Sequence, residues 1–458
     1  MPIRLTPRSS AAAMAWPAVP DGLAAQLLAL QQQLAQSEQW SPERLARHQF
    51  RQLRPLLLHA YDQSPFYRAR LDAGGYRRGQ EITPEFWARL PLLQKRDLQE
   101  QGAAALCREV PREHGGTISG STSGSTGAPL RTATTEHAQL IWQAITLRQQ
   151  YWHGRDLNLK FASIRRDRAN SAFPPSGTSY PDWLVPEGVV YPTGPACLLD
   201  NRCTPAEQAQ WLMREEPDYL LTFPSVALEI ARYLLDHGLG LKRLKEIGTL
   251  GEVVTPRARA ACRDAFGAEI RDMYSAVETG YLAIQCPAGR YHVQSESVLL
   301  EVLDDAGRPC RPGEIGQVVV TPLHNFAQPL LRYSISDFAE VGSDCACGRR
   351  LPVLNEIVGR ARDTVMLPSG TRRYAWFGMR KFAEIPEITQ FQVIQRTLYD
   401  LELKLVTRAP LSAASEEKLR ENLKKSLGEH FSVLLTYHAE IPRTASGKYF
   451  DFLSEVPG

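Results

Sequence analysis

The stretch Gly120-Ser-Thr-Ser-Gly-Ser-Thr-Gly-Ala-Pro129 decides how the chain is interpreted, because nine of its ten residues are Gly, Ser, Thr or Ala. Glycines let the backbone curl so that several N–H groups point inward, and the hydroxyl groups add further donors. A loop of this kind suits a polyphosphate, although a flexible linker has the same composition. It is not a Walker P-loop, because no Gly-Lys-Ser or Gly-Lys-Thr follows.

Two further segments have the residue types of a nucleotide site. Gly251-Glu252 follows an apolar run, and Met273-Tyr-Ser-Ala-Val-Glu-Thr-Gly280 places a Tyr four residues before a Glu. In a strand-to-loop setting, the Tyr ring could stack on a base and the Glu carboxylate could hold Mg²⁺. A buried Tyr and a solvated Glu are the plainer alternative for each segment on its own.

Two segments nearer the C-terminus each present one charged side chain. In Arg332-Tyr-Ser-Ile-Ser-Asp337, the Asp follows a strand-like run, where its carboxylate could accept two hydrogen bonds from a ribose diol. In Pro442-Arg-Thr-Ala-Ser-Gly-Lys448, a Lys on a Gly/Ser loop could neutralise a phosphate or a developing negative charge. Singly, these are more often a turn Asp and a surface Lys. The order of all five segments is more informative than any one of them.

The first hundred residues are predicted to be largely helical. Leucines recur at helical spacing from Leu23 to Leu34, after Asp21 as a candidate N-cap. A second helix is predicted from Ser41-Pro42-Glu43, which joins a capping Ser to a Pro at the first helical position. Residues 1–20 lack a continuous apolar core, so we predict a flexible tail there rather than a signal peptide.

Beyond about residue 117, helical segments alternate with short apolar runs, which is typical of an α/β fold. The predicted strands include Tyr219–Phe223, Glu246–Leu250, Ser297–Leu303 and Gln317–Thr321. We therefore predict a large domain of mixed sheets and helices over residues 21–361.

The last hundred residues are predicted to form a small α+β domain, residues 362–458, behind the charged stretch Gly359–Asp363. Its elements are two strands at 390–398 and 400–407, an amphipathic helix at 412–427 and a strand at 431–438.

Composition excludes several classes of protein. Of 458 residues, 43% are hydrophobic and 22% charged, which is ordinary for a globular protein. The net charge of +3 gives no overall field for nucleic acid or an anionic membrane, and no apolar run is long enough to span a membrane. We therefore expect neither a nucleic-acid nor a membrane partner and a cytoplasmic location, and we allow for a homodimer.

Four residues have the ligand types of a zinc site: Cys286 and His292, six residues apart, and Cys345 and Cys347 in Cys-Ala-Cys-Gly. Since four protein ligands leave no open position, we predict a structural Zn²⁺; ordinary loop cysteines are the alternative. The other cysteines show no such spacing, and no Ser-His-Asp or Cys-His nucleophile pattern favours a hydrolase.

The five segments, in this order, resemble the adenylate-forming superfamily of acyl-CoA synthetases, luciferases and adenylation domains. Within it, Arg44 to Arg70 with Ser64-Pro-Phe-Tyr67, and Leu90-Pro-Leu-Leu-Gln-Lys95, resemble the N-terminal helices of the phenylacetate–CoA ligase branch and its capsule-biosynthesis relatives. The resemblance covers about residues 40 to 455.

The resemblance implies roles for individual residues. Lys448 matches the catalytic Lys of the small domain, Glu278 the catalytic Glu that holds Mg²⁺, and Arg362 and Asp363 the hinge. The residues implied to bind the nucleotide are Ser121, Thr122, Ser123, Gly124, Ser125, Thr126, Gly127, Gly251, Glu252, Tyr274, Ser275, Asp337 and Arg360.

The chain departs from the family pattern at the phosphate loop and near Tyr274. Ala128 stands where the loop often has Lys, which removes one cation near the phosphates. Ser275 replaces a Gly, and Val277 replaces a Ser or Thr and cannot donate a side-chain hydrogen bond. These changes leave room for weakened or unusual activity.

The activity implied by the resemblance is activation of a carboxylic acid with ATP and Mg²⁺ as an acyl-adenylate, followed by transfer to a thiol, coenzyme A first of all. An aromatic acid is the first expectation, with Phe223, Pro224 and Ala276 as candidate walls of its pocket. A carrier-protein phosphopantetheine or an amine is the alternative acceptor. Two other classes stay open: a degenerate protein that binds nucleotide or acyl-adenylate without turnover, and a zinc-dependent interaction protein.

Overall fold

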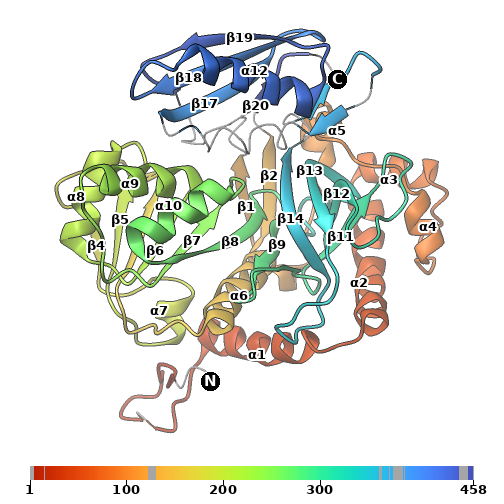
Figure 1. Cartoon of the computed structure of the whole chain (residues 1–458). Coiled ribbons are helices and arrows are strands. Elements are labelled where there is room, and N and C mark those ends of the chain that lie inside the picture. The colour runs from red at the N-terminus through yellow and green to blue at the C-terminus, as the bar shows by residue number, and fades with distance from the viewer. Residues whose placement is uncertain are drawn as a thin grey trace. The chain divides into compact units, whose positions relative to one another are not determined.

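The computed structural model describes residues 5–14, 16–121, 130–360, 364–370, 372–374, 385, 387–442 and 452–456. The chain divides into two compact units, of which the large unit comprises Met1–Ile335 and Ala339–Ile357. The small unit comprises Ser336–Phe338 and Val358–Gly458. Each unit is described separately below (Figure 1).

The helices begin where the sequence offers a cap. Ser41 accepts a hydrogen bond from the Arg44 N–H, and a Pro follows at the first helical position, as predicted. Asp21 stands at the N-cap of the first helix but makes no side-chain capping bond. The described helices of the large unit are α1 (Gly22–Ser37), α2 (Pro42–Gln63), α3 (Pro65–Ala73), α4 (Pro84–Arg89), α5 (Lys95–Gln101), α6 (Glu136–His153), α7 (Glu187–Val190), α8 (Pro205–Glu215), α9 (Pro224–Asp236) and α10 (Pro256–Phe266), with 3₁₀ turns at Gly102–Ala105 and Arg112–His114.

A twelve-stranded mixed sheet forms the centre of the large unit, in the order β11-β12-β13-β14-β10-β9-β8-β7-β6-β3-β5-β4. Its strands are β3 (Phe161–Arg165), β4 (Thr178–Tyr180), β5 (Ala196–Asp200), β6 (Tyr219–Thr222), β7 (Glu246–Leu250), β8 (Glu269–Ala276), β9 (Gly280–Gln285), β10 (Tyr291–Val293), β11 (Val298–Leu303), β12 (Ile315–Pro322), β13 (Tyr333–Val341) and β14 (Val353–Arg360). A separate hairpin pairs β1 (Thr117–Ser121) with β2 (Arg131–Thr135).

Five neighbouring strands, β5-β3-β6-β7-β8, run parallel, and helices cover both of their faces. Side chains alternate between the faces of a strand. In β6, Leu220 packs in one hydrophobic cluster with α8, α9 and α10, whereas Leu221 packs in another with α6. Parallel strands buried on both faces are typical of α/β proteins.

Residues 5–20 contain no helix or strand among the described positions, but they are not free of the large unit. The backbone N–H of Arg8 donates to the Val190 carbonyl at 2.8 Å, and its Nε donates to the Gly188 carbonyl at 2.7 Å. Arg8 therefore attaches the predicted flexible tail to α7.

The small unit contains a four-stranded sheet in the order β19-β18-β17-β20. Leu419, Leu423 and Leu427 of its helix pack in one cluster with Val393 and Leu403 of the central strands. The elements are β15 (Thr364–Met366), β16 (Arg372–Tyr374), β17 (Ile388–Gln395), β18 (Asp400–Thr407), α12 (Ala413–Leu427), β19 (Ser432–Tyr437) and β20 (Phe452–Ser454). The predicted fold class, a large α/β region followed by a small α+β region, is confirmed, and the mobility of the small domain stays a prediction.

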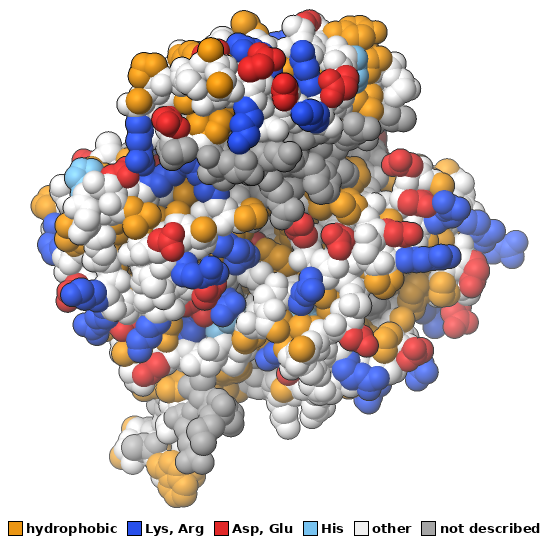
Figure 2. Space-filling view, in the orientation of Figure 1, with side chains coloured by type: hydrophobic (Ala, Val, Ile, Leu, Met, Phe, Trp, Pro, Cys, Tyr) orange, Lys and Arg blue, Asp and Glu red, His pale blue; other side chains and the backbone are white. Residues whose placement is uncertain are grey.

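The described surface agrees with the small net charge. Figure 2 shows Lys and Arg side chains interspersed with Asp and Glu side chains over the face that it presents. Within the described ranges, no helix combines the length and the apolar character needed to cross a membrane.

Candidate functional site

Two of the five predicted segments, and the candidate pocket residues Phe223 and Pro224, follow neighbouring strands of the large sheet. β6, β7 and β8 are parallel neighbours, with Thr222 opposite Thr249 and Leu250 opposite Met273. Their carboxyl ends therefore lie side by side. In open α/β sheets, ligands bind outside these ends.

At the end of β7, the backbone turns sharply and Glu252 contacts a helix. Gly251 has a φ of +78°, in the left-handed region that favours glycine. An Oε2 oxygen of Glu252 then accepts a hydrogen bond from the Ser225 N–H, at 3.0 Å, in the first turn of α9. Glu252 thus satisfies a backbone donor that the helix start leaves open.

At the end of β8, Tyr274 is buried and Glu278 lies in the turn that leads to β9. Ser275 pairs with Tyr281, and Ala276 with Gly280, across this hairpin. The Glu278 side chain is half-buried, whereas Val277 is 57% exposed. The structure therefore brings Gly251, Glu252, Tyr274, Ser275 and Glu278 to one edge of the sheet, together with Phe223, Pro224 and Ala276.

The other predicted residues that the structure describes lie on β1, β13 and β14. Ser121 ends β1 and is exposed, Asp337 is buried on β13, and Arg360 ends β14. The predicted residues outside the described ranges are Thr122, Ser123, Gly124, Ser125, Thr126, Gly127, Arg362, Asp363 and Lys448.

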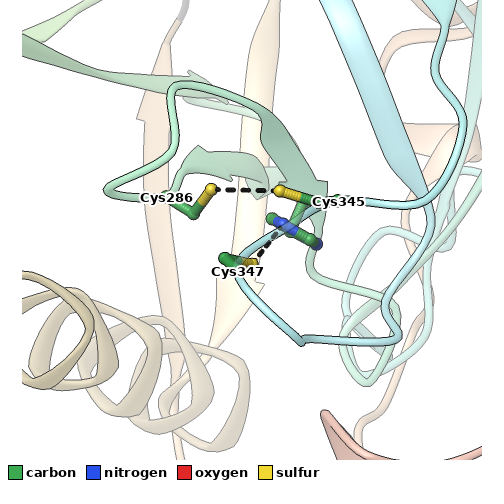
Figure 3. Close-up of side chains that lie close together, drawn as sticks. Cys286, Cys345 and Cys347 are labelled. Atoms are coloured by element: carbon green, nitrogen blue, oxygen red, sulfur yellow. Dashed lines mark hydrogen bonds between the residues drawn. The ribbon is translucent and has the colours of Figure 1, made fainter.

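The predicted metal ligands converge on one point. Cys286 follows β9, His292 lies on β10, and Cys345 and Cys347 belong to the loop between β13 and β14. The four ligand atoms lie within 4.8 Å of one another. The Sγ atoms of Cys286 and Cys345 are 3.6 Å apart, and the Sγ of Cys347 is 3.2 Å from Nε2 of His292 (Figure 3).

These distances suit a tetrahedral zinc ion. Zn–S bonds of about 2.3 Å place two thiolate sulfurs of a tetrahedron about 3.8 Å apart. The Nδ1 of His292 is 3.2 Å from the Leu351 carbonyl, which orients the ring so that Nε2 faces the sulfurs. Burial lowers the pKa of His292 to about 4, so the ring is neutral at pH 7, as a ligand must be.

Side chains around the cluster close it and favour a thiolate. The Trp152 ring meets the His292 ring edge-on at 5.8 Å, and the Arg349 guanidinium lies over Trp152 at 4.3 Å. Burial of Cys347 opposes ionisation, but hydrogen bonds from the backbone and side chain of Arg349 lower its pKa overall. Burial raises the pKa of Cys345 to about 11, so Arg349 favours a thiolate at Cys347 rather than at every cysteine of the cluster.

The sequence analysis did not identify Asp272, a buried acid on β8 that is hydrogen-bonded both to Thr249 on β7 and to Tyr291 beside the Cys/His cluster. The Oδ1 of Asp272 on β8 accepts a hydrogen bond from the Thr249 hydroxyl at 2.6 Å, and its Oδ2 accepts one from the Tyr291 hydroxyl at 2.8 Å. Burial raises the pKa of Asp272 to about 6. The signal in the sequence is an Asp at an inward position of a strand whose other inward residues, Ile270 and Tyr274, are apolar or aromatic.

Comparisons with known proteins cover almost the whole chain. A phenylacetate–coenzyme A ligase from Thermus thermophilus is 25% identical over 442 residues, which are 89% of this chain and 95% of that protein. A phenylacetate–coenzyme A ligase from Pseudomonas putida is 25% identical over 347 residues, which are 71% of this chain and 73% of that protein. A family model for the CapK C-terminal domain matches residues 379–453.

Among solved structures, a 2-hydroxyisobutyryl-CoA ligase in complex with an acyl-AMP has a similar fold. Its TM-score is 0.72 at 20% identity, over 91% of both chains. The chain therefore shares the fold of this ligase, and its relatives along most of its length are phenylacetate–coenzyme A ligases, in agreement with the resemblance to the adenylate-forming superfamily found in the sequence.

Proposed function

We propose that this protein is an AMP-forming acid–thiol ligase. It activates a carboxylic acid with ATP as an acyl-adenylate and transfers the acyl group to coenzyme A. The observation that carries the proposal is the end-to-end similarity to phenylacetate–coenzyme A ligases, combined with the gathering of Gly251, Tyr274 and Glu278 at one edge of the sheet.

The first half-reaction makes a poor electrophile reactive. A carboxylate oxygen attacks the α-phosphorus of ATP, pyrophosphate leaves, and a mixed anhydride results. Such a displacement needs positioning and charge neutralisation more than covalent help from the protein. Tyr274 would pack on the adenine and Lys448 would neutralise charge on the reacting phosphate. Glu278 would hold Mg²⁺, which supplies further charge neutralisation at the phosphates.

The second half-reaction needs access for a thiol. The thiolate of coenzyme A attacks the acyl carbon, and AMP leaves. We assign the small domain to residues 362–458, with Arg362 and Asp363 as the hinge about which it turns to withdraw Lys448 after the adenylate has formed. Asp337 would bind the ribose and Arg360 would reach the nucleotide.

The acid and the acceptor are the finer parts of the proposal. We propose an aromatic acid, by analogy with the phenylacetate of the relatives' names, held beside Phe223, Pro224 and Ala276. Coenzyme A is the first acceptor, and a carrier-protein phosphopantetheine or an amine is the alternative. A homodimer and a cytoplasmic location complete the proposal.

Two substitutions in the family pattern favour a second candidate, a protein that binds acyl-adenylate without turnover. Ala128 removes a cation from the phosphate loop, and Val277, 57% exposed, offers no hydroxyl donor beside Glu278. The family's other charged residues, Glu278, Asp337 and Lys448, are all retained, which supports turnover.

We also propose that Cys286, His292, Cys345 and Cys347 hold a structural Zn²⁺. The spacing of their ligand atoms within 4.8 Å supports this, as does the orientation of His292 by the Leu351 carbonyl. With four protein ligands, the ion has no open position for substrate, so its role would be to fix the loop between β13 and β14 against β9 and β10.

The function is tested by ATP–pyrophosphate exchange, measured with Mg²⁺ on the purified chain across a panel of aromatic and aliphatic acids. We expect exchange that depends on the acid and is fastest with an aromatic one. Formation of the thioester is then followed with coenzyme A and with a phosphopantetheinylated carrier protein. Tight ATP binding without exchange for any acid would instead support the binding protein.

A further inference from the structure

The carboxyl ends of β3 and β5 carry a second group of side chains, three arginines, an asparagine and a phenylalanine, that the proposed chemistry does not use. Arg166, Arg168 and Phe173 lie in the loop after β3, and Asn201 and Arg202 lie in the turn after β5. We call these five residues the β3–β5 cluster. All five belong to the large unit.

The loop after β3 has a defined shape, because a buried carboxylate holds it. Asp167 accepts hydrogen bonds from the backbone N–H groups of Ala169, Ser171 and Ala172, at 3.0, 2.6 and 2.9 Å. Its own N–H donates to Asp200 at the end of β5, at 2.9 Å. The loop therefore presents its side chains from a fixed backbone.

An aromatic ring and a guanidinium are held together at the surface. The Nε of Arg202 donates to Asp200 at 2.8 Å, and the guanidinium carbon lies 5.0 Å from the centroid of the Phe173 ring. Phe173 is nevertheless 38% exposed. An exposed ring backed by a cation is a platform on which a base can stack.

The charges of the cluster suit a phosphate. Arg166 and Arg168 are exposed, whereas Asp167 and Asp200 are buried beneath the loop. Arg166 lies 3.8 Å from Asp200, too far for a short ion pair, so its guanidinium keeps donors for a ligand. Arginines presented in this way recognise phosphate oxygens.

The Asn201 side chain points independently to a ligand. It is 4% exposed, and neither its Oδ1 nor its Nδ2 has a hydrogen-bond partner in the described structure. Its backbone N–H donates to the Arg165 carbonyl at 3.2 Å, which places it between the ends of β3 and β5. A buried amide without partners is unfavourable, so a bound group that donates to it or accepts from it is favoured.

The cluster lies at a useful distance from the proposed adenylate site. Arg166, Arg168 and Phe173 follow β3, and the order β8-β7-β6-β3 puts three strand spacings between β8 and β3, about 14 Å at 4.8 Å each. The connections of β3 and β6 run to opposite sides of the sheet, so the edge between them is a topological switch point. The pantetheine arm of coenzyme A, about as long as five extended residues, spans roughly 16 Å.

We propose that the β3–β5 cluster binds the 3′-phosphorylated adenine nucleotide end of coenzyme A, with the arm running along the sheet edge toward Tyr274 and Glu278. The adenine stacks at Phe173 and the 3′-phosphate is bound by Arg166 and Arg168. This proposal rests on the proposed function for the use of the thiol, but it assigns a site of its own.

The test measures affinity for coenzyme A and for 3′-dephospho-coenzyme A by calorimetry. The unaltered chain is expected to bind coenzyme A at least about tenfold more tightly, because charge-assisted hydrogen bonds to the extra phosphate are lost in the analogue. Arg166→Ala/Arg168→Ala is expected to abolish this preference and to leave the affinity for the analogue unchanged. Phe173→Ala is expected to weaken both ligands alike, and Phe173→Trp to restore them.

The control is Arg47→Ala/Arg51→Ala, which removes two exposed arginines from α2 and is expected to keep the full preference. Equal affinity of the unaltered chain for the two ligands, or a preference that survives Arg166→Ala/Arg168→Ala, would overturn the proposal. ATP–pyrophosphate exchange, which requires no coenzyme A, is measured in parallel and is expected to be unchanged in both double variants. Its absence in the unaltered chain would count against acid activation, whereas the two affinities report on the nucleotide site alone.

Discussion

The Cys/His cluster and the nucleotide-site edge lie on neighbouring parts of one sheet, but they differ in how far the protein completes them by itself. All four ligand atoms of the cluster lie within 4.8 Å of one another. At the carboxyl ends of β6, β7 and β8, the structure gathers Gly251, Tyr274 and Glu278, whose proposed partners are a nucleotide and Mg²⁺ rather than one another. A site made of protein ligands is specified by the fold, whereas catalytic contacts often tighten only when substrate is bound.

The largest effect on activity is expected from a substitution at Lys448. If Lys448 were not needed for exchange, the contrast between a structural cluster and a catalytic site would fail. Lys448→Ala should lower ATP–pyrophosphate exchange by about 100-fold or more, because a positioned charge on the reacting phosphate is lost. The unfolding temperature is expected to stay the same, because the proposed role of Lys448 is in the reaction and not in folding. Exchange rate and thermal unfolding are measured on the same preparation.

The matched control is Lys425→Ala, which removes an exposed Lys paired with Glu421 on α12. It should leave exchange within about twofold of the unaltered chain, as surface ion pairs contribute little. Equal exchange in both variants would remove Lys448 from the catalytic residues.

At the cluster, the effect should appear in stability rather than in chemistry. Cys345→Ser should remove the bound zinc and lower the free energy of unfolding by roughly 4 kcal/mol, the stabilisation expected from a ligand present at about 1,000 times its dissociation constant. Zinc content is measured by elemental analysis and stability by thermal unfolding. Cys310→Ser, outside the cluster, should change neither; zinc retained at full stoichiometry in Cys345→Ser would refute the four-ligand site.

A smaller effect is expected when the Mg²⁺ contact is weakened at the nucleotide edge. Glu278→Gln keeps the size of the side chain but removes its charge, so exchange should fall about 10-fold to 100-fold and recover in part at high Mg²⁺. Exchange is therefore titrated with Mg²⁺ in the variant and in Glu269→Gln, a control at the opposite end of β8 from the turn that carries Glu278. An unchanged Mg²⁺ dependence in Glu278→Gln would assign the ion to other ligands.

Asp272 tests whether the two regions are coupled, because it lies on the strand of Tyr274 and accepts a hydrogen bond from Tyr291, the neighbour of His292. Burial raises its pKa to about 6, above the value of about 3.9 for an exposed Asp. The folded chain therefore binds the proton more tightly. The stabilisation is complete below about pH 4 and is lost as the pH rises through 6.

Asp272→Asn should remove this dependence on pH. The difference in free energy of unfolding between pH 4 and pH 7 is expected to change by roughly 2–3 kcal/mol relative to the unaltered chain. Denaturant unfolding at the two pH values measures it, with the exposed Asp264→Asn on α10 as control. The same pH difference in Asp272→Asn and the unaltered chain would show that the carboxyl group does not ionise in this range.

Much of the fold follows from local pattern. The runs at Glu246–Leu250 and Asp400–Thr407 form strands at those residues, and Ser41-Pro42 begins a helix as predicted. In each case a period or a cap acts within a few residues, so tertiary context has little to override. Strand ends were less exact: the strand predicted at 390–398 is β17, Ile388–Gln395, because its ends are set by its pairing with β18.

The Cys/His cluster could be predicted from the sequence, because its residue types are those that bind zinc. Three Cys and one His at short spacings indicate a metal before any geometry is known, and the structure brings those four together. Asp272 was missed although it alternates with Ile270 and Tyr274 on one face of β8, and Asn201 was missed because no such alternation surrounds it. Their burial depends on strands and helices distant in sequence, such as β10 for Asp272.

The separation of the cysteines along the chain also affects the conformational entropy of the unfolded chain. Cys286 and Cys345 are 59 residues apart, and β11, β12 and β13 lie between them. An ion that keeps ligands from both ends would close this stretch into a loop, as a disulfide does. The lower entropy of the unfolded chain would then raise its free energy by about 4 kcal/mol at 25 °C. Asp337 lies inside that loop. The segment carrying the proposed ribose contact would then search a smaller conformational space during refolding with zinc than without it.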